Sequence, residues 1–149
     1  MYHIPTVKVQ LVRDGATATE KKRCATPADS AALLRTYLAG ADREHFVVLL
    51  LNVKHGVIGI NTIAVGTLCA APVHPREVFK AAILANAYSI IVGHNHPSDD
   101  PAPSQADDIV TKRLVEAGTL LGIPVVDHII ITEDTEDFFS YLTAGRLPQ

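Results

Sequence analysis

The residues most suited to chemistry lie in the stretch GHNHPSDDPAPSQAD, residues 93–107, which directly follows a short apolar run. His94 and His96 are separated by one residue, and the stretch ends at Asp107. In an extended segment alternate side chains point to the same face, so both imidazoles face a common point and Asn95 faces the other way. Two histidines and one carboxylate are typical of a catalytic metal site, because they leave coordination positions open for water.

The carboxylate in this pattern comes from the start of a predicted helix. Ser104 and Asp107 have the spacing of a capping box, which predicts that the helix begins here. The apolar residues that mark the buried face of this helix are Val110, Leu114, Ala117 and Leu121. Asp107 shares that face, whereas Asp108 is turned about 100° away. We therefore expect Asp107 to point toward the imidazoles, ionised by the positive end of the helix dipole.

Each part of the pattern also has a structural explanation when it is taken alone. Histidine pairs of this spacing are common, and Ser-x-x-Asp before an apolar helix is most often only a cap. The combination favours a metal site, because it joins the end of a buried strand to the start of the next helix. Ligands bind at such strand ends in α/β sheets.

Predicted strands and helices alternate along the chain, which indicates an α/β fold with a layered sheet. Helices are predicted over residues 27–40, 75–87 and 104–122, the first capped by Thr26. Strands are predicted over residues 6–12, 45–53, 88–93 and 123–132, with two more in 54–69 around a turn at 55–56 and a short strand or turn in 138–149.

Length and composition predict one domain over residues 1–149, with a core at about 27–142. The chain is 48% hydrophobic but only 5% aromatic, so we expect one compact core of Val, Ile, Leu and Ala. The longest apolar run, 46–51, is too short to cross a bilayer, and the first ten residues lack the layout of a signal peptide. These features predict a cytoplasmic protein with no membrane partner, and they carry no signal for an oligomeric state.

Cysteines and net charge exclude several classes of protein. Cys24 and Cys69 form no CxxC motif, so we expect reduced, structural cysteines and no cysteine zinc site. A net charge of −3 argues against an extended nucleic-acid surface. The basic run at residues 21–23 is therefore expected to be a solvated turn, and DNA is the weaker of the expected partners.

The stretch HNHPSDDPAPSQAD resembles the H-x-H-x7-S-x2-D signature of the JAMM, or MPN, metalloprotease domain, with His94, His96, Ser104 and Asp107 at its four positions. The flanking sequence resembles the bacterial RadC-like branch of that family. The matching segments are VGTL at 65–68, HPREVFKAA from residue 74, NHPS, LLGIPVVDHIII from residue 120 and Ser-Tyr at 140–141. The resemblance extends from Pro27 to Leu142.

The resemblance implies a three-layered, cytidine-deaminase-like α/β fold with Zn²⁺ held by His94, His96, Asp107 and a water. It also implies peptidase or isopeptidase activity on a peptide or protein substrate, in which the zinc-activated water attacks an amide carbonyl. Ser104 would stabilise the oxyanion. An upstream glutamate would be the general base; Glu44, just before a buried strand, has the family's placement. Glu77 is the alternative, although an acid in the first turn of a helix is ordinarily structural.

Departures from the family pattern concern three places. Asp99 stands where RadC-like proteins usually have glycine; aspartate tolerates positive φ better than most residues, and its charge together with that of Asp100 would disfavour an acidic substrate. Asp127 and His128 are expected to form a hydrogen-bonded structural pair, with support of the metal ligands as the alternative. The chain begins close to its predicted core, so we expect the catalytic-type module without the N-terminal helical domain, which weakens an inherited role in DNA repair.

Competing functions remain open at this point. A non-catalytic module could use the metal as a structural staple and act in partner binding or DNA repair. Two histidines and a carboxylate also match non-haem Fe(II) oxygenases, but alternating strands and helices argue against the all-β folds in which those sites usually occur. A nucleobase deaminase is excluded, because its H-x-E and P-C-x-x-C ligands are missing.

Overall fold

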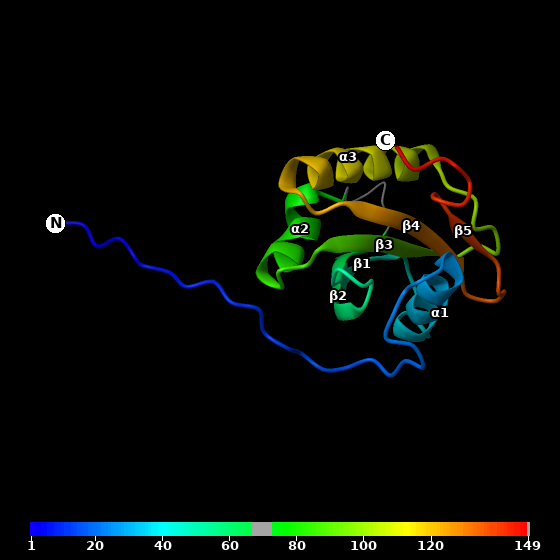
Figure 1. Ribbon diagram of the computed structural model, residues 1–149, viewed down its shortest axis with the longest axis horizontal. Coiled ribbons are helices and arrows are strands. Elements are labelled where there is room, and N and C mark those ends of the chain that lie inside the picture. The colour runs from blue at the N-terminus through cyan, green and yellow to red at the C-terminus, as the bar shows by residue number, and fades with distance from the viewer. Residues whose placement is uncertain (67–72, 149) are drawn as a thin grey trace.

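A computed structural model describes residues 1–66 and 73–148 of the chain (Figure 1). Within these residues, five strands form one mixed sheet in the order β2-β1-β3-β4-β5. The strands are β1 (His45–Leu51), β2 (Val57–Val65), β3 (Ser89–His96), β4 (Val125–Thr132) and β5 (Phe138–Ser140). Only β3 and β4 are parallel; the other neighbouring pairs are antiparallel. The helices are α1 (Pro27–Tyr37), α2 (Pro75–Leu84) and α3 (Gln105–Leu121).

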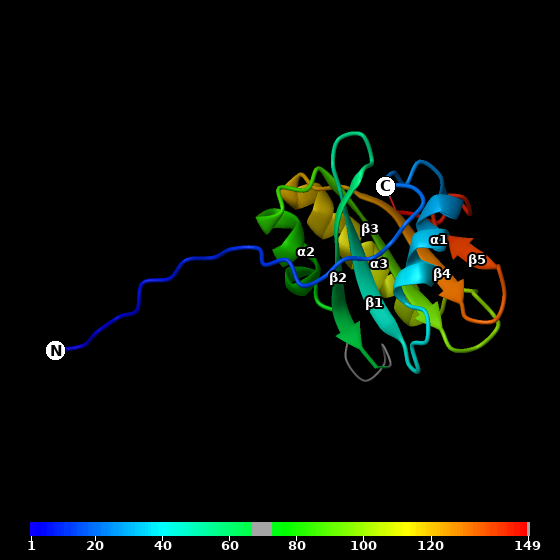
Figure 2. The same cartoon turned by 90° about the horizontal axis from the view of Figure 1, so that it is seen from below.

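The helices cover both faces of the sheet, α1 on one side and α2 with α3 on the other (Figures 1 and 2). The sheet therefore divides the buried apolar residues into two clusters instead of the one core expected. One cluster joins β1 and β3 to α2 and α3, and the other joins β1, β3 and β4 to α1. This arrangement confirms the predicted layered α/β fold. No helix in the described part of the chain is long and apolar enough to cross a membrane.

Both predicted helix caps are present. Thr26 caps α1 by accepting a hydrogen bond from the backbone N–H of Asp29, and Pro27 occupies the first turn. Ser104 caps α3 in the same way, because its hydroxyl oxygen accepts from the backbone N–H of Asp107 at 3.1 Å. The Asp107 carboxylate accepts in return from the backbone N–H of Ser104 at 2.8 Å, which completes the capping box.

The register between β1 and β3 decides which side chains meet at the end of the sheet. Backbone pairing runs from Leu51 opposite Ser89 to Phe46 opposite His94. Continuing this antiparallel register by two residues places Glu44 opposite His96. The same continuation keeps Glu44 on the face of Phe46, because side chains two residues apart share a face.

Two strand predictions were wrong. Residues 6–12 form no strand; they run extended and exposed, leading away from the sheet (Figures 1 and 2). Alternating apolar residues permit strand pairing, but no described residue pairs with this segment. Two strands were predicted within residues 54–69, but residues 54–66 contain one strand, β2. The predicted turn is present and includes His55 (φ 61°), and it joins β1 to β2 as a hairpin. Residues 67–69, at the end of the second predicted strand, lie outside the described residues.

Residues 21–24 bind to the body of the domain. Lys21 forms an ion pair with Asp29 at 2.8 Å, and Arg23 donates to the backbone carbonyl of Lys54 at 2.9 Å. Cys24 is buried, and burial raises the pKa of its thiol. It has no disulfide partner among the described residues, and Cys69 lies outside them.

Gly118 allows the last turns of α3 to pack closely against the loop that leads into β4. A Cβ atom at this position would lie 2.5 Å from the carbonyl oxygen of Ile123, which is backbone and cannot rotate away. We expect Gly118→Ala to lower the free energy of unfolding by about 1–3 kcal/mol, measured by urea denaturation. Lys112→Ala, an exposed change on the same helix, is the control and should alter stability by less than about 0.5 kcal/mol. Equal stabilities of the two variants would contradict this close packing.

Candidate metal centre

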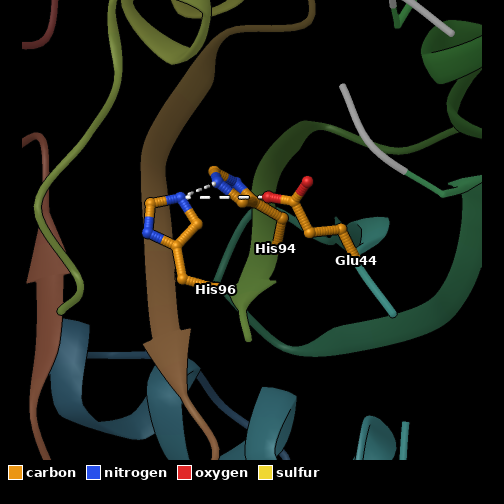
Figure 3. Close-up of side chains that lie close together, drawn as sticks. All are labelled: Glu44, His94 and His96. Atoms are coloured by element: carbon orange, nitrogen blue, oxygen red, sulfur yellow. Dashed lines mark hydrogen bonds and ion pairs between the residues drawn. The ribbon is translucent and has the colours of Figure 1, made fainter. Parts of the chain in front are cut away.

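His94 and His96 project from the same face at the end of β3, with their Nε2 atoms 3.1 Å apart (Figure 3). Glu44, in the segment just before β1, points toward them, and its Oε1 lies 4.0 Å from Nε2 of His96. One ligand atom from each of these three residues lies within 4.8 Å of the others. Glu44, His94 and His96 therefore form a candidate metal site.

Asp107 contacts both histidines from the start of α3. Its Oδ1 is 3.2 Å from Nε2 of His94, and its Oδ2 is 3.3 Å from Nε2 of His96. Oδ2 also accepts the capping bond from Ser104, whereas Oδ1 is buried with no hydrogen-bond partner among the described residues. A buried carboxylate oxygen without a hydrogen bond, next to two imidazole nitrogens, requires another explanation, and a cation between these atoms would provide it.

The spacing of these donor atoms fits tetrahedral coordination. Bonds of about 2.0–2.1 Å to a tetrahedral metal place neighbouring ligand atoms about 3.3–3.4 Å apart. The Nε2 atoms of His94 and His96 are 3.1 Å apart, and the Asp107 carboxylate contacts them at 3.2 Å through Oδ1 and 3.3 Å through Oδ2, which is close to that spacing. Glu44 lies farther out, at 4.0 Å from its nearer histidine. The two histidines are thus common to two sets of three residues, and Asp107 makes the tighter one.

A chain of buried hydrogen bonds sets the tautomer of His94. Its Nδ1 is 2.9 Å from Nε2 of His128, and Nδ1 of His128 is 2.6 Å from the Thr111 hydroxyl. Thr111 donates its only hydroxyl proton to the Asp107 carbonyl at 2.7 Å, so its oxygen accepts from Nδ1 of His128. Burial lowers the pKa of His128 well below its ordinary value, so His128 is neutral and its Nε2 accepts. Nδ1 of His94 is therefore the donor, which leaves a lone pair on Nε2.

His96 is oriented by a backbone group. Its Nδ1 lies 3.1 Å from the carbonyl oxygen of Asp100, which can only accept, so Nδ1 donates. The Nε2 atom of the neutral ring consequently carries the lone pair toward Asp107. Asp100 also accepts the backbone N–H of Ala102 at 2.9 Å through its own carboxylate, which stabilises the loop after β3. Both imidazoles thus turn an acceptor nitrogen to the same point.

Charge at the centre is concentrated on Asp107. Burial of this carboxylate favours its neutral form, but hydrogen bonds that His94 and His96 donate when Nε2 carries a proton outweigh burial and hold the pKa of Asp107 well below its ordinary value. The hydrogen bond to Asp107 in turn raises the pKa of His96, against the opposing effect of burial. A proton and a metal ion therefore compete for the same Nε2 lone pair.

Aromatic rings enclose this row of imidazoles. Phe46 stacks on His94 at a centroid distance of 5.8 Å, and Tyr141 stacks on His128 at 4.9 Å. The Tyr141 hydroxyl donates to Asp108 at 2.7 Å, and this carboxylate also binds Arg146. As the helix phase predicted, Asp108 points away from the histidines. The apolar surroundings strengthen electrostatic interactions at the centre.

Asp127 and His128 point to opposite faces of β4 and have different contacts. Asp127 accepts hydrogen bonds from the Ser140 hydroxyl at 2.6 Å and from the backbone N–H of Leu142 at 3.0 Å, which anchors the chain after β5. His128 contacts His94. The backbone N–H of His128 donates to the Asp127 carboxylate at 2.7 Å, so the expected hydrogen-bonded pair is present through the main chain of His128. The contact of the His128 ring with His94 at 2.9 Å matches the alternative of support for a metal ligand.

The remaining predicted site residues lie as follows. Glu77 is on α2, where its carboxylate pairs with Lys80 at 2.7 Å and is not part of the group around Glu44. Ser104 lies beside Asp107 through the capping box. Asp99 is exposed, and it is not among the described non-glycine residues with positive φ, so aspartate carries no backbone strain there.

Comparison with known proteins identifies the family. A model of the RadC-like JAB domain matches residues 24–146. The chain belongs to the RadC-like JAB domain family. A UPF0758 protein of Rubrobacter xylanophilus is 52% identical over 122 residues, which cover 82% of this chain and 52% of the relative. A UPF0758 protein of Caldanaerobacter subterraneus is 53% identical over 116 residues, which cover 78% and 50%. This JAB domain thus spans about half the length of these curated relatives.

Two residues that support the centre of this JAB domain, Thr111 and Asn95, were not predicted from the sequence. Thr111 lies one helical turn after Asp107, so its helical spacing could have indicated a shared face. Asn95 binds the backbone on both sides of Glu44. No local pattern could have indicated that contact, because it depends on the register between β1 and β3.

The hydrogen-bond chain behind His94 gives a testable prediction. Thr111→Val keeps the shape of the side chain but removes the acceptor for His128, so we expect Zn²⁺ affinity to fall about 10- to 100-fold in a chelator-competition titration. Thr119→Val is the matched control, since Thr119 on the same helix also donates to a carbonyl four residues earlier, that of Val115 at 2.9 Å. If both variants bind Zn²⁺ as tightly as the unmodified domain, the hydrogen bonds through His128 and Thr111 do not orient His94.

Proposed function

We propose that this JAB domain is a zinc-dependent hydrolase of the peptidase or isopeptidase type. The observation that carries the proposal is the convergence of two imidazole lone pairs and the Asp107 carboxylate at contacts of 3.1–3.3 Å, with Oδ1 of Asp107 lacking a hydrogen-bond partner among the described residues. Glu44 lies just outside this group, with its Oε1 4.0 Å from Nε2 of His96. This position suits a residue that accepts a proton from the attacking water. Membership of the RadC-like JAB domain family supports a metallohydrolase.

His94, His96 and Asp107 would hold the metal. Two nitrogens and one oxygen are ligands that suit Zn²⁺, and three protein ligands leave a position for water or substrate. When bound, zinc would lower the pKa of a water to about 7 and polarise the carbonyl of the substrate. The hydrogen bonds at both Nδ1 atoms hold the rings in the orientation that coordination needs, so little rearrangement accompanies binding.

Glu44 is proposed as the general base. Its carboxylate side chain is 18% exposed, so it lies at the border between the buried histidines and solvent, where water and substrate enter. Oε1 would accept a proton from the attacking water and deliver it to the nitrogen of the departing amine. Glu77 is unsuited to this role, because its carboxylate is paired with Lys80 on α2.

Ser104 is proposed to stabilise the tetrahedral oxygen of the substrate. Its hydroxyl oxygen already accepts the N–H of Asp107, so the hydroxyl proton remains available for donation. A preorganised donor of this kind contributes about 3 kcal/mol to transition-state stabilisation. Because the same hydroxyl caps α3, Ser104→Ala would change both stability and rate.

The proposed substrate is a peptide or protein amide. The exposed acids Asp99 and Asp100 follow the metal ligands along the chain, and they would disfavour acidic residues near the cleaved bond. DNA fits less well, because the chain carries a net charge of −3. A non-catalytic module with a structural metal is the alternative that the experiment must separate.

The proposed base is tested by Glu44→Gln, with Glu77→Gln as the matched control. We expect Glu44→Gln to retain Zn²⁺ but to lose about 100- to 10,000-fold in the rate of hydrolysis, because the amide cannot accept the proton. Glu77→Gln should match the unmodified domain. His94→Ala should lose both metal and activity. Metal content is measured by mass spectrometry of the purified protein, and hydrolysis with a peptide library.

Three outcomes would contradict the proposal. Failure of the purified protein to bind Zn²⁺ would contradict the proposed metal centre. Zn²⁺ binding with no cleavage of any peptide, together with unfolding of His94→Ala, would indicate the structural-metal module. Loss of activity in Glu77→Gln and not in Glu44→Gln would reverse the assignment of the base.

A further inference from the structure

Asn95 lies between the two histidines in sequence, but its side chain points to the opposite face of β3. Its Oδ1 accepts a hydrogen bond from the backbone N–H of His45 at 2.7 Å, and its Nδ2 donates to the backbone carbonyl of Arg43 at 3.0 Å. The donor and acceptor roles are unambiguous, because a backbone N–H only donates and a carbonyl only accepts. One buried side-chain amide therefore binds the main chain on both sides of Glu44.

These two bonds occur where the backbone ladder between β1 and β3 ends. The last backbone pair joins Phe46 to His94. Among the described residues, those before Phe46 have no strand partner on the β3 side, so their N–H and C=O groups need other partners. The Asn95 amide supplies one acceptor and one donor in a single plane, and so continues the antiparallel pairing by one step without a further backbone pair.

A third bond holds the other edge of the same segment. The backbone carbonyl of Glu44 accepts from the N–H of Gly66, just after β2, at 2.8 Å. The main chain of Glu44 is thus fixed from both neighbouring strands, while its side chain extends toward His96 (Figure 3). Only rotation about the side-chain bonds of Glu44 remains to move its carboxylate.

We propose that Asn95 is a positioning residue for Glu44, which it keeps opposite His96 by bridging Arg43 and His45. This inference rests on the proposed function, because it concerns the placement of the proposed base. Asn95 cannot itself be a metal ligand or touch substrate at the centre, since it is 7% exposed and faces away from both imidazoles. Alanine would lose both bonds, whereas aspartate would keep the acceptor for His45 but place a second acceptor against the carbonyl of Arg43.

The kinetic test uses Asn95→Ala and Asn95→Asp. We expect kcat to fall about 10- to 100-fold in both, because a displacement of about 1 Å at a reacting group has that effect. KM and Zn²⁺ content should change little. In a Glu44→Gln background the same substitutions should reduce the residual rate less than about threefold, since a residue that acts only through Glu44 has nothing left to position.

Asn52→Ala is the matched control. Asn52 is also a side-chain amide at an end of β1, where its Oδ1 accepts from the backbone N–H groups of Lys54 and Gly56 at 3.0 and 2.8 Å. It lies at the end of the strand far from the histidines, so Asn52→Ala should lower stability and leave kcat unchanged. Equal losses of kcat in Asn52→Ala and Asn95→Ala would indicate a general effect of stability and overturn the proposal.

A measurement without turnover separates this proposal from the proposed function. Amide hydrogen exchange at His45, followed by NMR, should accelerate at least about tenfold in Asn95→Ala, because the N–H loses its acceptor. Unchanged exchange at His45, unchanged kcat, or full additivity with Glu44→Gln would each overturn the positioning role. If the unmodified domain cleaves no peptide, the proposed function fails, while faster exchange at His45 would still show that Asn95 holds the segment around Glu44.

Discussion

Burial of the polar atoms of His94 and Asp107 is the constraint on which the rest of this JAB domain depends. Both side chains are completely inaccessible to solvent, so every donor and acceptor on them must find a partner inside the protein. Nδ1 of His94 and Oδ2 of Asp107 have protein partners. Nε2 of His94 and Oδ1 of Asp107 remain, facing each other and Nε2 of His96. The outer atoms of the group thus have protein partners, whereas the inner atom Oδ1 of Asp107 has no hydrogen-bond partner among the described residues, as expected of a candidate cation site.

The partners of these outer atoms close a ring through three elements of the fold. His94 on β3 contacts His128 on β4, and His128 contacts Thr111 on α3. Thr111 then donates to the carbonyl of Asp107, whose carboxylate contacts His94 again. Because every contact in the ring is buried and no longer than 3.2 Å, a shift of α3 relative to the sheet would separate Asp107 from His94 and also break the hydrogen bonds that orient His94. Stacking of Tyr141 on His128 extends the same restraint to the chain after β5.

The sequence predicted those parts of the site that depend on one element. Strand parity placed His94 and His96 on a common face, and helix phase selected Asp107, because both follow from backbone geometry alone. Contacts between elements depend on register, which no local pattern encodes. The register between β1 and β3 brings Glu44 opposite His96, and family resemblance, not spacing, indicated that residue. The strand prediction for residues 6–12 was wrong for a related reason, since an alternating pattern forms a strand only where another strand is available to pair.

The middle residue of the H-x-H motif shows how parity and register combine. The residues on either side of Asn95 must face α3 to meet Asp107, and parity then turns Asn95 toward the other face. The antiparallel register places the start of β1 beside Asn95 in the sheet, so an amide at this position reaches the main chain of Arg43 and His45. Three consecutive residues therefore set the candidate metal ligands on one side and hold the backbone of the proposed base on the other. If the residue between the histidines made no such hydrogen bonds, Glu44 would lie beyond the last backbone pair of β1 and β3. Of the bonds described above, its main chain would then keep the one to Gly66.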